Sequence, residues 1–181
     1  MAIWFLRLSA TLCFTTAAGA LSLIGLDWYR HSADEAEYGV ARQHVSSLGG
    51  RIFKDDYGNY IIELQRSSVT DAELERLVLA LQPLRSEHSS PDIERMFAFD
   101  LSATSVGDRG VQAIADLPLD WLNLNSTQIT DGAFPHLYDQ ERLAVMTVSE
   151  THVTWPAIQE MRAHSPHVWI PATLHGIGAQ P

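Results

Sequence analysis

Residues 98–114 of the chain read AFDLSATSVGDRGVQAI, and residues 121–137 read WLNLNSTQITDGAFPHL. The same pattern returns in IIELQRSSVTDAELERL at 61–77 and in VMTVSETHVTWPAIQEM at 145–161. All four segments align without a gap on one apolar anchor residue each, namely Val69, Val106, Ile129 and Val153. Internal repetition of this kind indicates that one structural unit recurs along the chain.

Hydropathy within the repeated segment predicts a strand followed by a helix. Apolar residues stand seven and five positions before each anchor, an alternation typical of a strand with one buried face. Apolar residues also stand five and eight positions after it, a three-residue step that places them on one side of a helix. Asp71, Asp108 and Asp131 lie two positions after their anchors, where a carboxylate can cap the helix and oppose its positive end.

The spacing of the anchors indicates a short stack of such units. Ile129 follows Val106 by 23 residues and Val153 follows Ile129 by 24, which is within the range of leucine-rich repeats. Val106 follows Val69 by 37 residues, so the first interval contains an insertion. This insertion, at 85–95, is polar and is expected to be a surface loop, whose role stays open.

Two of the segments carry a family resemblance. LSATSVGDRGVQAIADL at 101–117 and LNLNSTQITDGAFPHL at 122–137 resemble ribonuclease-inhibitor-like leucine-rich repeats in their bacterial form, LxLSxTxVTDxGLxxL. The resemblance covers about residues 60–170. LGGRIFKDDYGNYIIEL at 48–64 resembles the capping segment that precedes such repeats in short secreted or membrane-anchored bacterial proteins. The resemblance implies protein binding as the general role.

The predicted fold class is therefore α/β: a short leucine-rich-repeat solenoid of about four strand-turn-helix repeats, with an N-terminal capping helix and hairpin. A transmembrane or signal helix precedes them. The expected parts are an anchor or signal segment at 1–26, a linker with the capping helix and hairpin at 27–59, the repeats at 60–171 and a C-terminal tail at 172–181. The outer repeats are poorer copies, as terminal units of a solenoid often are: Trp155 replaces the repeated Asp, and Pro135 and Pro156 interrupt or start helices.

The capping segment is expected to contain a helix at 33–48 and then a hairpin. Ser32 and Glu35 form a capping box, and two glycines end the helix. The expected apolar face, which should pack on the domain edge, comprises Ala33, Ala36, Val40, Ala41, Val45 and Leu48. Turn-forming residues at 55–59 lie between β-prone runs at 51–54 and 60–64, which predicts the hairpin.

The N-terminal segment carries a membrane signal. Residues 8–26 read LSATLCFTTAAGALSLIGL, an uncharged run close to the length that crosses a bilayer core. Arg7 precedes the run and acidic residues follow it, so the positive-inside rule places the C-terminal domain outside the cytoplasm. We expect a single-pass membrane protein held through residues 3–26. The alternatives are secretion after cleavage near Ala18-Gly19-Ala20, or a buried helix of a soluble protein.

Composition narrows the function classes. Lys and Arg total 12 against 22 for Asp and Glu, so the net charge of -10 lacks the basic footprint of a nucleic-acid binder. Cys13 is the only cysteine, which excludes an intramolecular disulfide and a multi-thiolate zinc site. The GxSxG, HExxH, Walker and GxGxxG signatures are absent from the sequence. We expect no catalytic, cofactor or metal site and no nucleic-acid partner.

The candidate binding residues lie on the predicted strands. Side chains between the core positions should face the concave side of the sheet, because strand side chains alternate. The expected protein-binding residues are Glu63, Asp100, Trp121, Asn123, Asn125 and Thr147. A flanking row holds Ile61, Ala98, Trp121 and Val145, and Trp169 extends the surface. An aromatic residue among polar groups is a typical contact anchor. Alternatively, these residues only solvate the sheet, and Trp121 packs on the capping segment.

Three functional hypotheses follow. The preferred one is a non-enzymatic protein-interaction module tethered at a membrane, with an unidentified protein partner. The second is a structural, envelope-associated spacer whose acidic surface maintains solubility. The third is an enzyme of unfamiliar class, whose sign would be a retained metal or a pocket that gathers His152, His164 and His167. Pro166 weakens the third hypothesis because it separates two of these histidines from a shared helical face.

Overall fold

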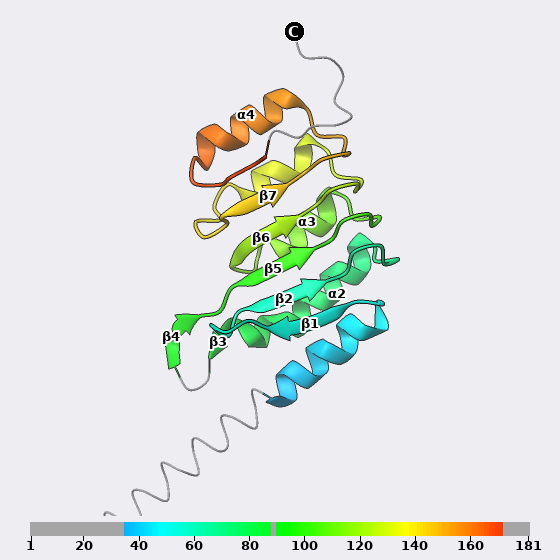
Figure 1. Cartoon of the computed structure of the whole chain (residues 1–181), viewed down its shortest axis with the longest axis vertical. Helices are drawn as coiled ribbons and strands as arrows, with labels where there is room; N and C mark the ends of the chain where they lie inside the picture. The colour runs from blue at the N-terminus through cyan, green and yellow to red at the C-terminus, as the bar shows by residue number, and fades with distance from the viewer. Residues whose placement is uncertain (1–34, 88–89, 172–181) are drawn as a thin grey trace, which may run out of the picture.

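A five-stranded sheet runs along the molecule, with strand order β1-β2-β5-β6-β7 (Figure 1). The computed structural model describes residues 35–87 and 90–171. The strands are β1 (Arg51–Lys54), β2 (Tyr60–Glu63), β5 (Phe97–Asp100), β6 (Leu119–Asn123) and β7 (Val145–Thr147). β1 pairs antiparallel with β2, and every other pair is parallel. The predicted α/β class and the predicted hairpin are therefore confirmed.

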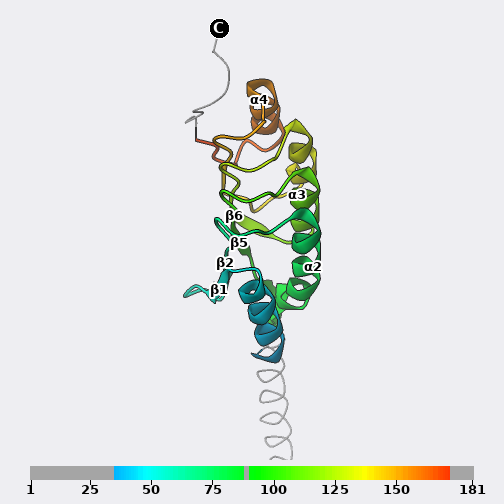
Figure 2. The same cartoon turned by 90° about the vertical axis from the view of Figure 1, so that its right-hand side faces the viewer.

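A helix follows each of the last four strands and lies on one face of the sheet, so the molecule has two layers (Figure 2). The helices are α2 (Asp71–Leu81), α3 (Asp108–Ile114), η2 (Asp131–Leu137) and α4 (Trp155–His164). We number the strand-turn-helix units 1 to 4 in this order. In unit 3 the predicted α-helix is a 3-10 helix. Gly132 and Pro135 disfavour an α-helix there, since proline cannot donate to the helical ladder.

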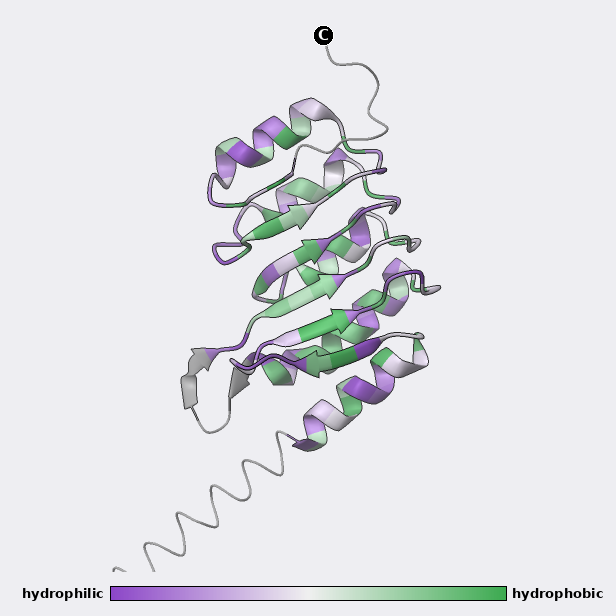
Figure 3. Ribbon diagram, in the orientation of Figure 1, coloured by the Kyte–Doolittle hydropathy of each residue, from purple (hydrophilic) through white to green (hydrophobic). Residues whose placement is uncertain are grey.

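The core lies between the sheet and the helices. Along β2 and β5 every second side chain is buried, as the predicted strand alternation requires. Hydrophobic residues are frequent in the strands of the sheet (Figure 3). The equivalent strand positions Ile62, Phe99, Leu122 and Met146 are all fully buried. They belong to one apolar cluster with the first helix positions Leu74, Val111, Phe134 and Ile158. The apolar core therefore holds the strands in place beneath the side chains of the helix-free face.

An N-terminal helix, described over 35–47, covers the β1 end of the sheet (Figure 1). Ala41 and Val45 on it are fully buried, and the Tyr38 ring stacks on Tyr60 with 5.9 Å between centroids. The predicted apolar face is wrong at Ala36, which is exposed, and at Val40, which is 61% exposed, because Tyr38 provides the contact instead. The expected capping box at Ser32 and the expected membrane segment lie outside the described residues. Within 35–87 and 90–171, no helix is both long enough and apolar enough to cross a bilayer.

The insertion between units 1 and 2 is not the surface loop that its polarity predicts. After η1 (Gln82–Arg85), the strands β3 (Ser86–Glu87) and β4 (Ser90–Glu94) form an antiparallel ribbon. The ends of the ribbon are tied, because Arg85 pairs with Glu94 at 3.2 Å and the Arg95 amide donates to the Arg85 carbonyl at 2.8 Å. This pairing of its two ends explains why the insertion forms strands.

The turn after each strand repeats from unit to unit. Its third residue adopts a left-handed backbone conformation in all four units, with φ of 55° to 58°, at Arg66, Ala103, Ser126 and Glu150. In units 2 to 4 the next residue is a threonine whose hydroxyl donates to the carbonyl at the end of the strand. These bonds join Thr104 to Leu101, Thr127 to Leu124 and Thr151 to Val148. The hydroxyl thus satisfies a backbone acceptor that the turn would otherwise leave buried and unpaired.

The repeated aspartates connect successive units. The Asp71 carboxylate accepts from the Gly107 amide at 2.7 Å. Asp108 and Asp131 each accept from both the amide and the hydroxyl of the threonine before the next helix, Thr130 and Thr154, at 2.6 to 2.8 Å. These aspartates lie in the first turn of their helices, where they oppose the positive end as predicted. The prediction that they also cap these helices is wrong, because the residue before each aspartate, such as Thr70 or Thr130, occupies the cap position. We call this series of contacts the aspartate ladder.

Candidate functional site

The helix-free side of the sheet, which we call the open face, carries the predicted binding residues (Figure 2). Glu63, Asp100, Asn123 and Thr147 stand at matched positions of adjacent parallel strands, and each is half-buried. Trp121 lies on β6 beside Ala98 of β5 and Val145 of β7. The structure therefore places the predicted side chains of the four strands on one surface.

A chain of hydrogen bonds joins three of these side chains. The Thr147 hydroxyl donates to Asn123 Oδ1 at 2.8 Å, and Asn123 Nδ2 donates to Asp100 Oδ1 at 3.1 Å. Glu63 does not join this chain; its carboxylate pairs with Arg51 on β1 at 2.6 Å. The chain holds each side chain in one orientation across the sheet. Such a surface is pre-organised, which lowers the entropy lost when a partner binds.

The polar side chains near the carboxyl ends of the strands accept hydrogen bonds mainly from backbone amides of the turns. The Asn125 side-chain oxygen accepts from the Ser149 amide at 2.7 Å. Asp100 Oδ1 accepts from both the amide and the hydroxyl of Ser102, at 3.0 and 2.6 Å. Asn125 and Asp100 therefore fix the turns as well as facing outward.

A hollow of about 260 Å³ opens beside Trp121, where the strands begin. Its lining comprises Asp55, Asn59, Ile61, Met96, Ala98, Asp120 and Trp121. The predicted flanking row supplies Ile61, Ala98 and Trp121, while the hairpin turn supplies Asp55 and Asn59. Trp121 thus lines one hollow together with the capping hairpin.

A register shift in the sheet brings Asp120 to this hollow. Phe97 pairs with Leu119, but the next residue, Ala98, pairs with Trp121, so Asp120 is an extra residue in β6. Such a bulge re-aims neighbouring side chains and is frequent beside functional sites. Asp120 and Trp121 are consequently both half-buried, although a regular strand would place them on opposite faces.

Two carboxylates give the hollow a negative potential. Burial alone would raise the pKa of Asp55, but hydrogen bonds from Asn59, Tyr57 and Gly58 hold that pKa below its ordinary value, so the group stays ionised at neutral pH. In the part of the chain that the structure describes, no donor reaches the Asp120 carboxylate. Arginine and lysine are absent from the lining.

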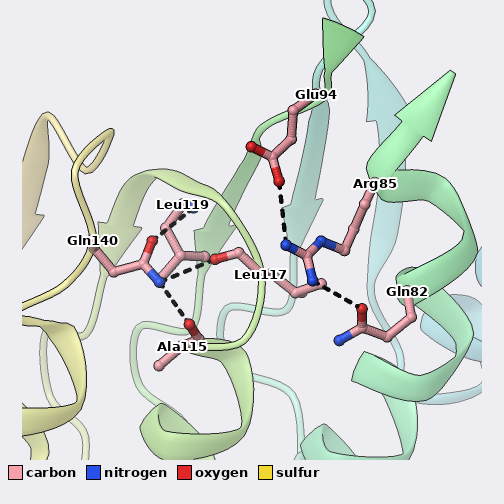
Figure 4. Close-up of polar contacts among 7 residues, drawn as sticks. All are labelled: Gln82, Arg85, Glu94, Ala115, Leu117, Leu119 and Gln140. Atoms are coloured by element: carbon pink, nitrogen blue, oxygen red, sulfur yellow. Dashed lines mark hydrogen bonds and ion pairs between the residues drawn. The ribbon is translucent and has the colours of Figure 1, made fainter. Parts of the chain in front are cut away.

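A second hollow, of about 240 Å³, lies between the β3-β4 ribbon and the loop after η2, and Gln140 braces it (Figure 4). Gln140 Nε2 donates to the carbonyls of Ala115 and Leu117 at 2.6 and 3.2 Å, and its oxygen accepts from the Leu119 amide at 3.1 Å. Arg85 nearby is paired with Gln82 and Glu94. These polar groups hold successive connections together, so we assign the second hollow a structural role.

Two histidines of the enzyme hypothesis, His164 and His167, have separate partners. His164 stacks on the Tyr138 ring with 4.1 Å between centroids, and His167 Nε2 lies 3.1 Å from the Gln140 carbonyl. Over residues 35–87 and 90–171, no cluster of three histidine, cysteine or acidic side chains is arranged to hold a metal ion.

Trp169 pairs beside Val145 and is 63% exposed, so it continues the open face as expected.

No protein-family model matches this chain, and no curated protein matches it. The site is therefore defined by its residues alone. Sequence reasoning missed Asp55, Asn59, Met96 and Asp120. One signal for their position was available in the sequence. Trp121 lies in the same flanking row as Ile61, which comes just after the hairpin turn.

Proposed function

We propose that this chain is a non-enzymatic protein-interaction module of leucine-rich repeats, tethered at a membrane, that binds a protein partner through its open face. The observation that carries the proposal is the half-buried Trp121 beside a hollow, on a sheet face that the helices leave uncovered. Aromatic residues in such settings supply much of the binding energy at protein interfaces. The polar side chains around it are already held in place by hydrogen bonds.

Three further features support the solenoid interpretation. The four units share their buried positions and their left-handed turn residue, and the aspartate ladder links each unit to the next. A stack of units that contact mainly their neighbours is the defining property of repeat proteins. The solenoid interpretation alone does not identify the partner, because one fold can serve many functions.

The membrane location rests on the sequence of residues 3–26. We propose a single-pass topology with the repeats outside the cytoplasm; secretion after cleavage near Ala20 is the alternative. Fractionation of a C-terminally tagged chain, with protease accessibility in intact cells and the mass of the product, tests it. A full-length membrane product whose tag is cut from outside supports the anchor. A soluble product that starts near Leu21 supports secretion, and a full-length cytosolic product contradicts both.

The second candidate function is a structural spacer at the cell envelope. The hydrogen-bond chain from Thr147 to Asp100 favours it, because polar groups that satisfy each other have less need of a partner. A spacer requires the stack to be stable but requires nothing from Trp121.

Substitution of Trp121 separates the two candidates. Trp121→Ala removes the half-buried anchor, and Leu79→Ala, at a residue that is 72% exposed on α2, is the matched control on the helix side. We expect chemical cross-linking in native cells to recover a partner with the native chain and with Leu79→Ala but not with Trp121→Ala. Thermal unfolding must show that both variants remain folded. Equal recovery with Trp121→Ala contradicts binding through the open face and favours the spacer.

A further inference from the structure

The hollow beside Trp121 combines apolar walls with acidic charge. Ile61, Met96, Ala98 and Trp121 supply the walls. The two charged groups of the lining, Asp55 and Asp120, are both acids. A ligand that fits must therefore bury an apolar part and bring a positive charge.

The remaining polar group of the lining, Asn59, is partly committed to its neighbours. Asn59 Nδ2 donates one of its two hydrogens to the Asp55 carboxylate at 3.0 Å, and Asn59 Oδ1 accepts from the Met96 amide at 3.1 Å. The lining therefore offers a ligand mainly acceptor oxygens, which favours a ligand that brings hydrogen-bond donors, as a cationic head does. What the site retains is the negative charge of Asp55 and the Asp120 carboxylate, which accepts no hydrogen bond from the described residues.

Size restricts the ligand to about one side chain. The volume of about 260 Å³ is below that of the pockets that hold drug-sized ligands, which start at roughly 300 Å³. Long cationic side chains bury an aliphatic stem on apolar surface and keep the charged head among polar groups. A tryptophan ring adds a cation-π attraction when the charge lies over its face.

We propose that the Trp121 hollow receives a lysine or arginine side chain of the protein partner. This inference rests on the proposed function and specifies its contact. The stem lies against Ile61, Met96, Ala98 and Trp121, and the cationic head lies between Asp55 and Asp120. The net charge of -10 attracts a basic partner at longer range.

The test titrates the full-length chain, in a non-ionic detergent, with Nα-acetyl-lysine amide and with Nα-acetyl-norleucine amide. The second probe has the same stem without the ammonium group. The readout is the ¹⁵N indole resonance of Trp121, assigned with Trp121→Phe. We expect the lysine probe to shift this resonance and the norleucine probe to bind roughly fivefold more weakly, the scale of one exposed charge contact. Asp120→Asn should weaken lysine binding by about the same factor.

Asp116→Asn is the matched control, since Asp116 is an exposed acid outside this hollow. It should leave lysine binding unchanged. Equal binding of the norleucine probe, an unmoved Trp121 resonance or an Asp120→Asn variant that binds lysine normally would each overturn the proposal. Because the probes are single amino-acid amides, this test fails or succeeds independently of partner capture. Loss of lysine binding with intact capture through Trp121 removes this contact and leaves the proposed function standing.

Discussion

The two ends of the strands are built on different plans. At the carboxyl ends, four turns repeat one geometry, with a left-handed third residue in every unit and the aspartate ladder between units. At the amino ends no two of the four connections are alike: they are the hairpin turn at 55–59, the β3-β4 ribbon with its continuation to Met96, the short link 115–118 after α3, and the loop after η2 that Gln140 braces. The Trp121 hollow lies at this irregular end.

This difference indicates that the carboxyl ends of the strands determine the stability of the fold, while the amino ends determine what the protein binds. Repeated turns keep the strands in one register, and a change in one of them is felt by its neighbours through the ladder. Irregular connections can vary without disturbing that register, which is why binding residues gather on loops held by a rigid scaffold. Substitutions at the carboxyl ends should therefore destabilise the fold, while substitutions at the amino ends should mainly change binding.

The largest effect is expected from Leu124→Ala, in the fully buried residue that directly follows β6. Removing its side chain should lower the free energy of unfolding by about 3 kcal/mol, because lost burial and a cavity add together. The midpoint of urea unfolding measures this. Val40→Ala, at an exposed position of the N-terminal helix, should change the midpoint little. A loss below about 1 kcal/mol for Leu124→Ala would mean that the carboxyl ends do not secure the stack.

Gly110→Ala is expected to be next. A Cβ at Gly110 would lie 2.6 Å from Asp71 Oδ1 and 2.7 Å from Val106 Cγ1, so it presses on the ladder of the preceding unit. We expect a loss of about 2 kcal/mol, although alanine favours helix over glycine by about 1 kcal/mol.

Gly39→Ala is the matched control for this substitution. Gly39 is also helical, and nothing lies within 4 Å of its added Cβ. This variant should be as stable as the native chain or more stable. If both alanine variants raise the melting temperature, the close approach at Gly110 has no energetic consequence.

A smaller loss is expected from Asp108→Asn. The Asp108 carboxylate accepts two hydrogen bonds from Thr130, and an amide in its place has only one acceptor oxygen and no charge, so one accepted bond is lost and the other is weakened. We expect about 1 kcal/mol, since these groups are near the surface. Asp120→Asn at the irregular end is the control and should leave urea unfolding unchanged. An equal loss of stability from the two substitutions would contradict the predicted difference between the two ends of the strands.

The smallest effect concerns Asp55 and depends on pH. Its pKa is lowered in the folded chain relative to the ordinary value of 3.8, so the ionised group stabilises the hairpin turn above that value. The contribution disappears as the pH falls through the folded pKa. Asp55→Asn should therefore melt slightly below the native chain at pH 7, and the difference should vanish in strong acid. A difference that persists there would show that the charge is not its source.

Much of the fold was predictable because it rests on local patterns. The two-residue and three-residue spacings around Val106 and Ile129 locate the strands and the following helical segments, and the turn formers between Lys54 and Tyr60 locate the hairpin. The open face follows from strand alternation alone. Asp100, Asn123 and Thr147 are consequently found where they were expected.

The remaining features depend on contacts between units, which one segment does not encode. Asp108 is compatible with capping its own helix or with binding Thr130, and only the position of the next unit decides between them. The bulge at Asp120 arises from the pairing of β6 with β5. The left-handed residues Ala103 and Ser126 carry no glycine signal that would reveal their conformation.

The central claim is that the open face, and not the helix side, contacts a partner. A photo-reactive benzoylphenylalanine at Gln65, an exposed residue two positions after Glu63 at the carboxyl end of the open face, tests it most directly against the same group at Gln112, an exposed residue on α3. After illumination of native cells, we predict a covalent adduct with a protein from position 65 and none from position 112. An adduct from position 112 alone, or no adduct from position 65, would contradict the account.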